Sequence, residues 1–123
     1  AFFMDNIEAL RDYCLLKKGV TEELPFGPDT LVFKVMGKIF AIAPLDEIQL
    51  RVNLKCDPER ALELREQYSA IQPGYHMNKL HWNTIVQDGS IPGSLLKELI
   101  DHSYNLIVES LPRKTRNEWE ALE

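Results

Sequence analysis

The stretch Ile48–Cys56, with the sequence IQLRVNLKC, alternates apolar and polar side chains over nine residues. Successive side chains of a strand point to opposite faces of a sheet, so this period of two predicts a strand with one buried and one solvent-facing side. The predicted buried side carries Ile48, Leu50, Val52, Leu54 and Cys56, and the polar side carries Gln49, Arg51, Asn53 and Lys55. We expect the polar side chains to be at least partly exposed.

The segments around this strand predict further strands and helices without repeated β-α-β units. Two strands joined by a tight turn at Gly37-Lys38 precede it, and a helix capped by Asp57 follows it. The complete predicted order is a helix from Asp5 to Gly19, a loop over 21–30, strands over 31–36, 39–43 and 48–56, a helix from Asp57, a strand pair or bent strand within 75–87, a helix from Pro92 and a short helix capped by Thr115. This order predicts one α+β domain with a five-stranded, mainly antiparallel sheet and helices packed on one face.

Local signals predict further details of the chain. Asp5 with Glu8, and Thr115 with Glu118, have the spacing of capping boxes at helix starts. The segment Pro25-Phe26-Gly27-Pro28 places an apolar ring between two prolines, which predicts a rigid turn pinned onto the core.

Length and composition restrict the class of protein. The 123 residues suffice for one hydrophobic core, which we assign to residues 4–123, and we interpret residues 1–3 as an extension. No apolar run has the length of a membrane span, and no segment has the pattern of a signal peptide. Cys14 and Cys56 occupy apolar positions without metal-ligand spacing, which indicates buried, reduced thiols and a cytoplasmic protein.

One segment has a composition that the fold alone does not explain. The stretch Pro73–Thr84, PGYHMNKLHWNT, lies within a window from Gln67 to Gln87 that contains no Asp or Glu, although the formal net charge of the protein is −5. Aromatic rings and hydrogen-bond donors without acids suit an anionic or π-faced ligand. The alternative is structural, with Tyr75 and Trp82 as core anchors that keep a polar group hydrogen-bonded. In that interpretation Trp82 is largely buried, and Asn78 or His76 bonds the backbone near Asn53 or Lys55.

Several motifs together resemble the YjbR-like (MmcQ-like) family. They are Pro25–Gly27, Phe33–Ala41, Val52–Glu59, Tyr68, Pro73–Lys79, His81–Thr84 and Asp88–Ser90, and the resemblance extends from Met4 to Pro112. It implies the order α-β(3)-α-β(2)-α, here with one additional helix, in a fold similar to secretion chaperones and frataxin. The family is also described as DNA-binding, through a proposed double-wing motif of strand hairpins.

Two functions remain open from the residues. The first is non-catalytic binding of DNA or RNA, in which lysines contact phosphates, asparagine reads a base edge and aromatic rings stack on bases. Its predicted site residues are Lys34, Lys38, Arg51, Asn53, Lys55, Tyr75, His76, Asn78, Lys79, His81 and Trp82. The second is an interaction module for a protein, a peptide or a small ligand on the same sheet face. A continuous positive groove would favour nucleic acid, and a neutral aromatic groove would favour a peptide or a small ligand.

The sequence predicts no cofactor, no metal site and no catalytic residues. His76 and His81 are five residues apart, which places them on opposite faces of a straight strand. Cys56 is in phase with the buried side of its strand, which predicts an unreactive thiol. No phosphate-binding glycine loop or serine-hydrolase motif is present in the sequence.

Overall fold

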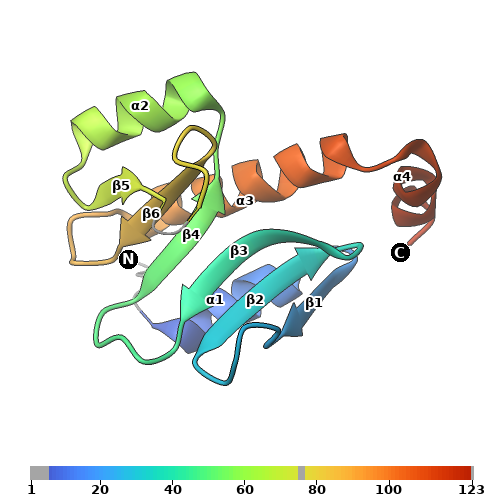
Figure 1. The fold of residues 1–123 in the computed structure, drawn as a ribbon, viewed down its shortest axis with the longest axis horizontal. Helices are drawn as coiled ribbons and strands as arrows, with labels where there is room; N and C mark the ends of the chain where they lie inside the picture. Colours follow the sequence, from blue (N-terminus) through green and yellow to red (C-terminus); the bar gives the residue numbers. More distant parts are fainter. Residues whose placement is uncertain (1–5, 75–76, 123) are drawn as a thin grey trace.

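The structure of the protein is a computed structural model that describes residues 6–74 and 77–122. Its centre is a sheet in which every neighbouring pair of strands is antiparallel, in the order β1-β2-β3-β4-β6-β5 (Figure 1). The strands are β1 (Val20–Glu23), β2 (Thr30–Val35), β3 (Lys38–Pro44), β4 (Arg51–Lys55), β5 (Ile71–Pro73) and β6 (Trp82–Val86). The predicted α+β class with an antiparallel sheet is therefore confirmed, and the predicted number of five strands is wrong.

Two of the six strands, β1 and β5, come from segments that we expected to be connections, and the predicted strand pair or bent strand within 75–87 contains one strand, β6, among its described residues. Strand β1 lies where a loop was predicted, because Val20–Glu23 pairs with Val32–Val35 at the edge of the sheet. Strand β5 covers the end of the connection after the second helix and pairs with β6 alone. Both edge strands are too short to show a clear alternation in the sequence.

The chain does not form its sheet in sequence order. Strand β6 lies between β4 and β5 and pairs with both of them, so β4 and β5 never contact as a pair. The hairpin between β2 and β3 is simpler, and its turn holds Met36 at φ 50° and Gly37 at φ 86°. Glycine adopts positive φ at little cost, which explains Gly37 at the predicted tight turn.

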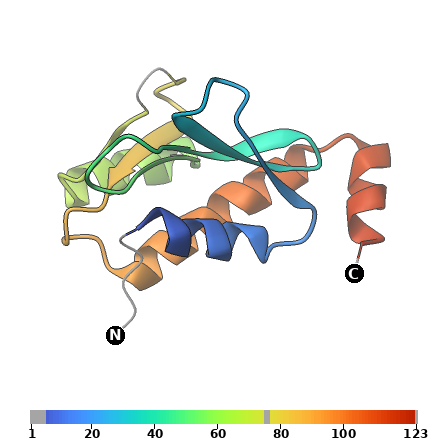
Figure 2. The same ribbon diagram turned by 90° about the horizontal axis from the view of Figure 1, so that it is seen from below.

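Helices cover one face of the sheet and leave the other face open. Helices α1 (Ile7–Leu15) and α3 (Gly93–Ser110) lie together under one face, whereas the opposite side carries only loops (Figure 2). Helix α2 (Pro58–Gln67) packs beside β5, and α4 (Arg113–Glu120) lies at the C-terminal end of the chain. No described helix is both long and apolar enough to cross a membrane.

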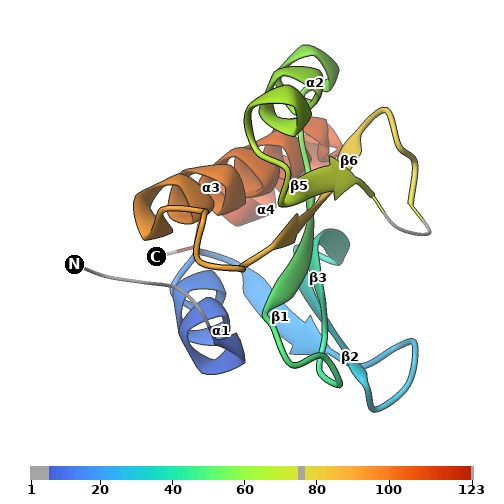
Figure 3. The same cartoon turned by 90° about the vertical axis from the view of Figure 1, so that its left-hand side faces the viewer.

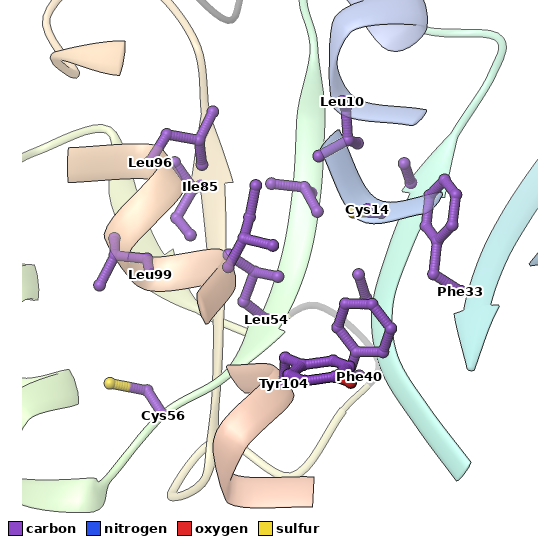
Figure 4. Close-up of a cluster of buried hydrophobic side chains, with 14 of the residues drawn as sticks. Leu10, Cys14, Phe33, Phe40, Leu54, Cys56, Ile85, Leu96, Leu99 and Tyr104 are labelled. Carbon is purple, nitrogen blue, oxygen red and sulfur yellow. The ribbon is translucent and has the colours of Figure 1, made fainter. Parts of the chain in front are cut away.

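The hydrophobic core fills the space between the sheet and these helices. Phe33, Phe40 and Leu54 from the sheet meet Leu10 of α1 and Leu96, Leu99 and Tyr104 of α3 (Figure 4). The rings of Phe40 and Tyr104 pack edge to face, with centroids 5.5 Å apart. The predicted burial of Leu50, Val52, Leu54 and Cys56 is confirmed, but Ile48 precedes β4 and is fully exposed.

Two predicted helix caps are displaced along the chain. The N-cap of α1 is Asn6, whose Oδ1 accepts the N–H of Ala9 at 2.8 Å; Asp5, the predicted cap, lies outside the described residues. Helix α4 begins directly after Pro112, so Thr115 lies inside the helix and does not cap it. The predicted cap of α2 is confirmed, since the carboxylate of Asp57 accepts the N–H of Arg60 at 3.2 Å.

Candidate functional site

The open face of the sheet carries the side chains that alternate with the core. Pairing of β3, β4 and β6 sets Ile42 beside Asn53 and Asn53 beside Thr84 across this face. The same register sets Lys55 beside Trp82. Polar residues of β4 thus lie between an apolar strand on one side and the aromatic start of β6 on the other.

A groove of about 480 Å³ crosses this face. Its floor comes from β3 and β4, and loops wall it at both ends of the strands. The β1–β2 loop and the β3–β4 loop close one end, and the loop between β5 and β6 closes the other. Figure 3 shows the first and the last of these loops projecting away from α1 and α3. The lining residues are Phe26, Thr30, Ile39, Ile42, Pro44, Glu47, Arg51, Asn53 and Met77.

Asn53 is the buried polar residue of the groove. Only 9% of the residue is exposed, so the prediction of a solvent-facing side chain is wrong. The neighbouring strands and walls cover it. Its Oδ1 accepts the hydroxyl of Thr84, and its amide nitrogen donates to no acceptor within the described chain. This nitrogen still reaches solvent, because among the described residues only Nε of Arg51 is both fully covered and without a hydrogen-bond partner.

Arg51 is held loosely at the same wall. Its Nη1 lies 4.0 Å from Oε1 of Glu47, at the limit of an ion pair, and both side chains are about 40% exposed. Pairs of this kind contribute at most about 1 kcal/mol. Its Nε is covered and has no hydrogen-bond partner in the described residues. Because Glu47 and Arg51 both line the groove, the groove has no excess of positive charge.

Exposed apolar side chains lie on the two loops that contribute Phe26 and Glu47 to the groove. Leu24 and Phe26 on the β1–β2 loop and Leu45 and Ile48 on the β3–β4 loop are all exposed. The two loops are joined, since the N–H of Leu45 donates to the carbonyl of Asp29 at 2.7 Å. Phe26 is 65% exposed, so the prediction that its ring is pinned onto the core is wrong. We call these four residues the apolar end.

Of the nine predicted nucleic-acid site residues that the structure describes, only Arg51 and Asn53 line the groove. Lys34 lies on β2 and pairs with Glu23 of β1 at 3.3 Å, which neutralises it. Lys38 is exposed at the tip of the β2–β3 hairpin. Lys55 and Trp82 are neighbours on the open face, as the register requires. The remaining predicted residues belong to the loop between β5 and β6: Asn78, Lys79 and His81, with Tyr75 and His76 outside the described residues.

That loop is fixed by an arginine that the sequence did not single out. Arg65 of α2 donates from Nε to Oδ1 of the buried Asn83 at 2.7 Å. Its Nη2 donates to the carbonyls of Lys79 and Trp82. Arg65 lies between Glu63 and Glu66 on α2 and carries no local signal of this role, because its acceptors belong to a distant strand and loop.

The structural interpretation of Pro73–Thr84 is correct only in outline. Trp82 is half-buried rather than largely buried. Asn78 does not bond β4; its Oδ1 accepts the N–H of Leu80 at 2.9 Å. The link to β4 is made by the backbone, where the N–H of Cys56 donates to the carbonyl of His81 at 2.8 Å. A Cβ at Gly74 would lie 2.8 Å from Cβ of Trp82, so glycine is required there.

The cysteines and the described histidines do not form a reactive centre. Burial raises the pKa of Cys14 to about 12 and also raises the pKa of Cys56, so both thiols stay protonated at neutral pH. Nε2 of His102 accepts the N–H of Asp57 at 3.1 Å and is occupied structurally. No group of three His, Cys, Asp or Glu among the described residues could hold a metal ion.

Comparisons with known proteins agree on the domain. The YjbR family model matches residues 15–106. The uncharacterised protein YjbR of Escherichia coli K12 is 37% identical over 111 residues, which cover 90% of this chain and 94% of that protein. The uncharacterised protein YbdF of Escherichia coli O157:H7 is 43% identical over 94 residues, which cover 73% of this chain and 74% of that protein.

Solved structures support the same assignment. A crystal structure of a Deinococcus radiodurans protein with a DUF419 domain matches with a TM-score of 0.90 at 38% identity, over 95% of this chain and 89% of that chain. A crystal structure of a Pseudomonas syringae protein matches with a TM-score of 0.71 at 30% identity, over 82% of this chain and 97% of that chain. These matches establish the fold and carry no activity with them.

Proposed function

The chain belongs to the YjbR family, and from this premise we propose that it is a non-catalytic binding module that holds an apolar segment of a partner protein in the open-face groove. The observation that carries this proposal is the composition of the groove. Phe26, Ile39, Ile42, Pro44 and Met77 give it apolar walls and floor, while a few polar groups stand among them. Concave apolar sites with a few placed polar groups are typical of ligand binding.

The apolar end favours a protein partner over a small molecule. Leu24, Leu45 and Ile48 are exposed on the same two loops that contribute Phe26 and Glu47 to the groove, and Leu24 and Leu45 also line a second hollow beside α1. Monomeric soluble proteins rarely expose contiguous apolar surface without a function for it. Large apolar side chains surrounded by polar ones are also typical of the centre of a protein interface. A partner that fills the groove would cover these loops at the same time.

A peptide-display selection on the purified protein tests this function. Selected peptides are titrated into the ¹⁵N-labelled protein, and we expect chemical shifts of Ile42, Asn53 and Met77 to move. Phe26→Ala should weaken binding at least tenfold, because truncating an aromatic anchor at an interface commonly costs more than about 1.4 kcal/mol. The matched control is Leu62→Ala, which truncates an equally exposed apolar side chain on α2 away from the groove.

The result that would contradict the proposal is equally specific. Peptides that bind elsewhere on the molecule, or that bind Phe26→Ala as tightly as the wild type, would exclude the groove. A selection that enriches no binding peptide would also count against it. Both variants alter exposed side chains, so each should keep the fold and give an interpretable titration.

A second candidate function, nucleic-acid binding, is favoured by three lysines. Lys38, Lys55 and Lys79 have no carboxylate within ion-pair distance among the described residues. Contacts to phosphates by such side chains would be mainly electrostatic and would fall steeply with salt. The neutral groove and the net charge of −5 make this the weaker candidate.

Fluorescence anisotropy with duplex and single-stranded oligonucleotides at low salt tests the second candidate. For duplex DNA, changing Lys55 and Lys79 to alanine together should make the slope of log affinity against log salt shallower by about 0.9 per lost phosphate contact. Lys114→Ala on α4 is the control, because it removes a lysine remote from the sheet. Absence of binding by the wild type at low salt would eliminate this function.

A further inference from the structure

We propose that the groove recognises the C-terminal end of its partner, with the terminal carboxylate bound by Arg51 and Asn53 and the last apolar side chain bound against Ile39 and Ile42. This inference rests on the proposed function and names the chemistry of its ligand. It follows from three features of the groove: an unpaired donor on the floor, a cation held weakly beside it, and a volume suited to one small ligand.

The unpaired donor is the amide nitrogen of Asn53. The residue is 91% buried and lines the groove, while its Oδ1 is occupied by the hydroxyl of Thr84. That bond fixes the orientation of the amide and leaves the N–H donors for another acceptor. None of the described residues supplies one. A ligand oxygen at this position would accept from a donor that otherwise bonds only water.

The cation is Arg51, two residues earlier on the same face of β4. It lies at the 4.0 Å limit of its pair with Glu47, and no acceptor among the described residues reaches its Nε. A carboxylate can accept two parallel hydrogen bonds from one guanidinium group, which is stronger and better oriented than the present contact. Exchange of Glu47 for a ligand carboxylate therefore improves the bonding of Arg51, and the charge of the ligand complements the cation that Glu47 releases.

The size of the groove favours a chain end. Its volume of about 480 Å³ lies in the range of sites that hold one small ligand, roughly 300–1,000 Å³. The lining includes Phe26 and Glu47 from loops at one end of the strands and Met77 from the loop at the other end. A chain terminus carries its carboxylate and its last side chain on the same residue, so both fit beside Arg51 and Ile42 within this space.

Titration of the ¹⁵N-labelled full chain with three synthetic peptides tests the inference. The peptides are acetyl-Ala-Phe-Leu with a free carboxylate, the same peptide as its C-terminal amide, and acetyl-Ala-Phe-Asp-Leu amide, which carries an internal acid. We expect the free acid to shift the Asn53 side-chain amide and to bind at least about tenfold tighter than either amide, as charged hydrogen bonds contribute.

Variants distinguish the hydrogen bonds donated by Arg51 and Asn53 from an effect of net charge alone. Arg51→Gln should reduce the affinity for the free acid to that for the amide, and Arg51→Lys should restore part of it. Asn53→Asp keeps an acceptor for Thr84 but removes the donor, so it should also abolish the preference for the acid. Lys38→Gln makes the same change of charge outside the groove and should leave the preference unchanged.

Each outcome decides between the inference and the proposed function. Equal binding of the acid and its amide in the groove would overturn the role of the carboxylate and leave the protein-binding function standing. Tight binding of the internal-acid peptide would show that the groove does not select a chain end. If no peptide shifts groove residues while display-selected peptides do, the terminal inference fails alone. If neither set shifts them, both proposals fail.

Discussion

The two faces of the sheet consist of side chains from the same strands, but these side chains become buried in different ways. On the covered face, Val52 and Leu54 of β4 pack in the core with α3, and the alternation of this strand alone places them there. On the open face, Arg51 and Asn53 of the same strand acquire their surroundings from three loops. Burial on the covered face follows from the local sequence of the strand. Burial on the open face depends on loops that are distant in the sequence. Stability should therefore depend mainly on the covered face and binding on the open face.

The sharpest test compares one phenylalanine from each face. Phe40 is fully buried against Tyr104, whereas Phe26 is exposed at the apolar end. Phe40→Ala should lower the free energy of unfolding by about 3–5 kcal/mol, as truncation of a buried ring does. Phe26→Ala should change it by less than about 0.5 kcal/mol. Urea denaturation followed by circular dichroism measures both, and similar losses in the two variants would abolish the distinction between the faces.

Trp82 lies between these extremes, on the open face but half-buried beside Gly74. Trp82→Ala should therefore lower the free energy of unfolding by about 2 kcal/mol, roughly half of the cost for a fully buried ring. The same denaturation experiment measures it. Trp82→Phe is the control and should recover most of the loss. A cost as large as that of Phe40→Ala would mean that the open face also contains core.

Arg65 tests whether a single side chain holds the wall of the groove. Arg65→Ala leaves Oδ1 of the buried Asn83 and two carbonyls without their donor, which should cost about 1–2 kcal/mol. Amide hydrogen exchange should rise in residues 77–81 and stay unchanged in α3. Arg65→Lys keeps the charge but loses the fork and should restore little. Uniformly faster exchange throughout the protein would indicate global destabilisation instead.

The smallest expected effect is a dependence of stability on pH through His102. Burial, and then the charge of Arg60, lower the pKa of His102 below its ordinary value of 6.5, and the neutral ring accepts the N–H of Asp57. The unfolded chain therefore binds this proton more readily than the folded one. Stability should be complete above about pH 6.5 and should decrease as the pH falls toward the lowered pKa. The decrease is small because a single, partly buried ring contributes it.

His102→Asn provides the comparison for that titration. Asparagine can still offer an oxygen to the N–H of Asp57 and has no proton to bind in this range. Thermal unfolding between pH 5 and pH 7.5 should show a shallower slope in the variant. A slope equal to that of the wild type would assign the pH dependence to other groups.

The sequence predicted the covered face well because its information is local. The alternation of Leu50, Val52 and Leu54 and the helical spacing of Leu96, Leu99 and Ile100 each specify burial without knowledge of partners. Strand β1 was missed because Val20–Glu23 is short, half polar and extended only through its pairing with β2. The conformation of Val20–Glu23 is therefore determined by tertiary context rather than by its own sequence.

The site was predicted far less completely. Arg51 and Asn53 were identified from their strand. The burial of Asn53 depends on neighbouring strands and loops, which the alternation of one strand does not predict. Phe26 was assigned to the core because an apolar ring between prolines is usually inward, and here it forms a wall. The donors of Arg65 reach backbone carbonyls, which no side-chain pattern reveals. DNA binding and the cytoplasmic location remain predictions.

The position of β6 between β4 and β5 also governs how the molecule can be assembled during synthesis. A nascent chain that has emerged only as far as β5 contains β1 to β4 in order, with the far edge of β4 open. An unpaired strand edge can recruit another nascent chain. Arg51 and Lys55 stand at the two ends of β4, where charged residues oppose such pairing. These two cations therefore protect the growing chain until β6 emerges to complete the sheet.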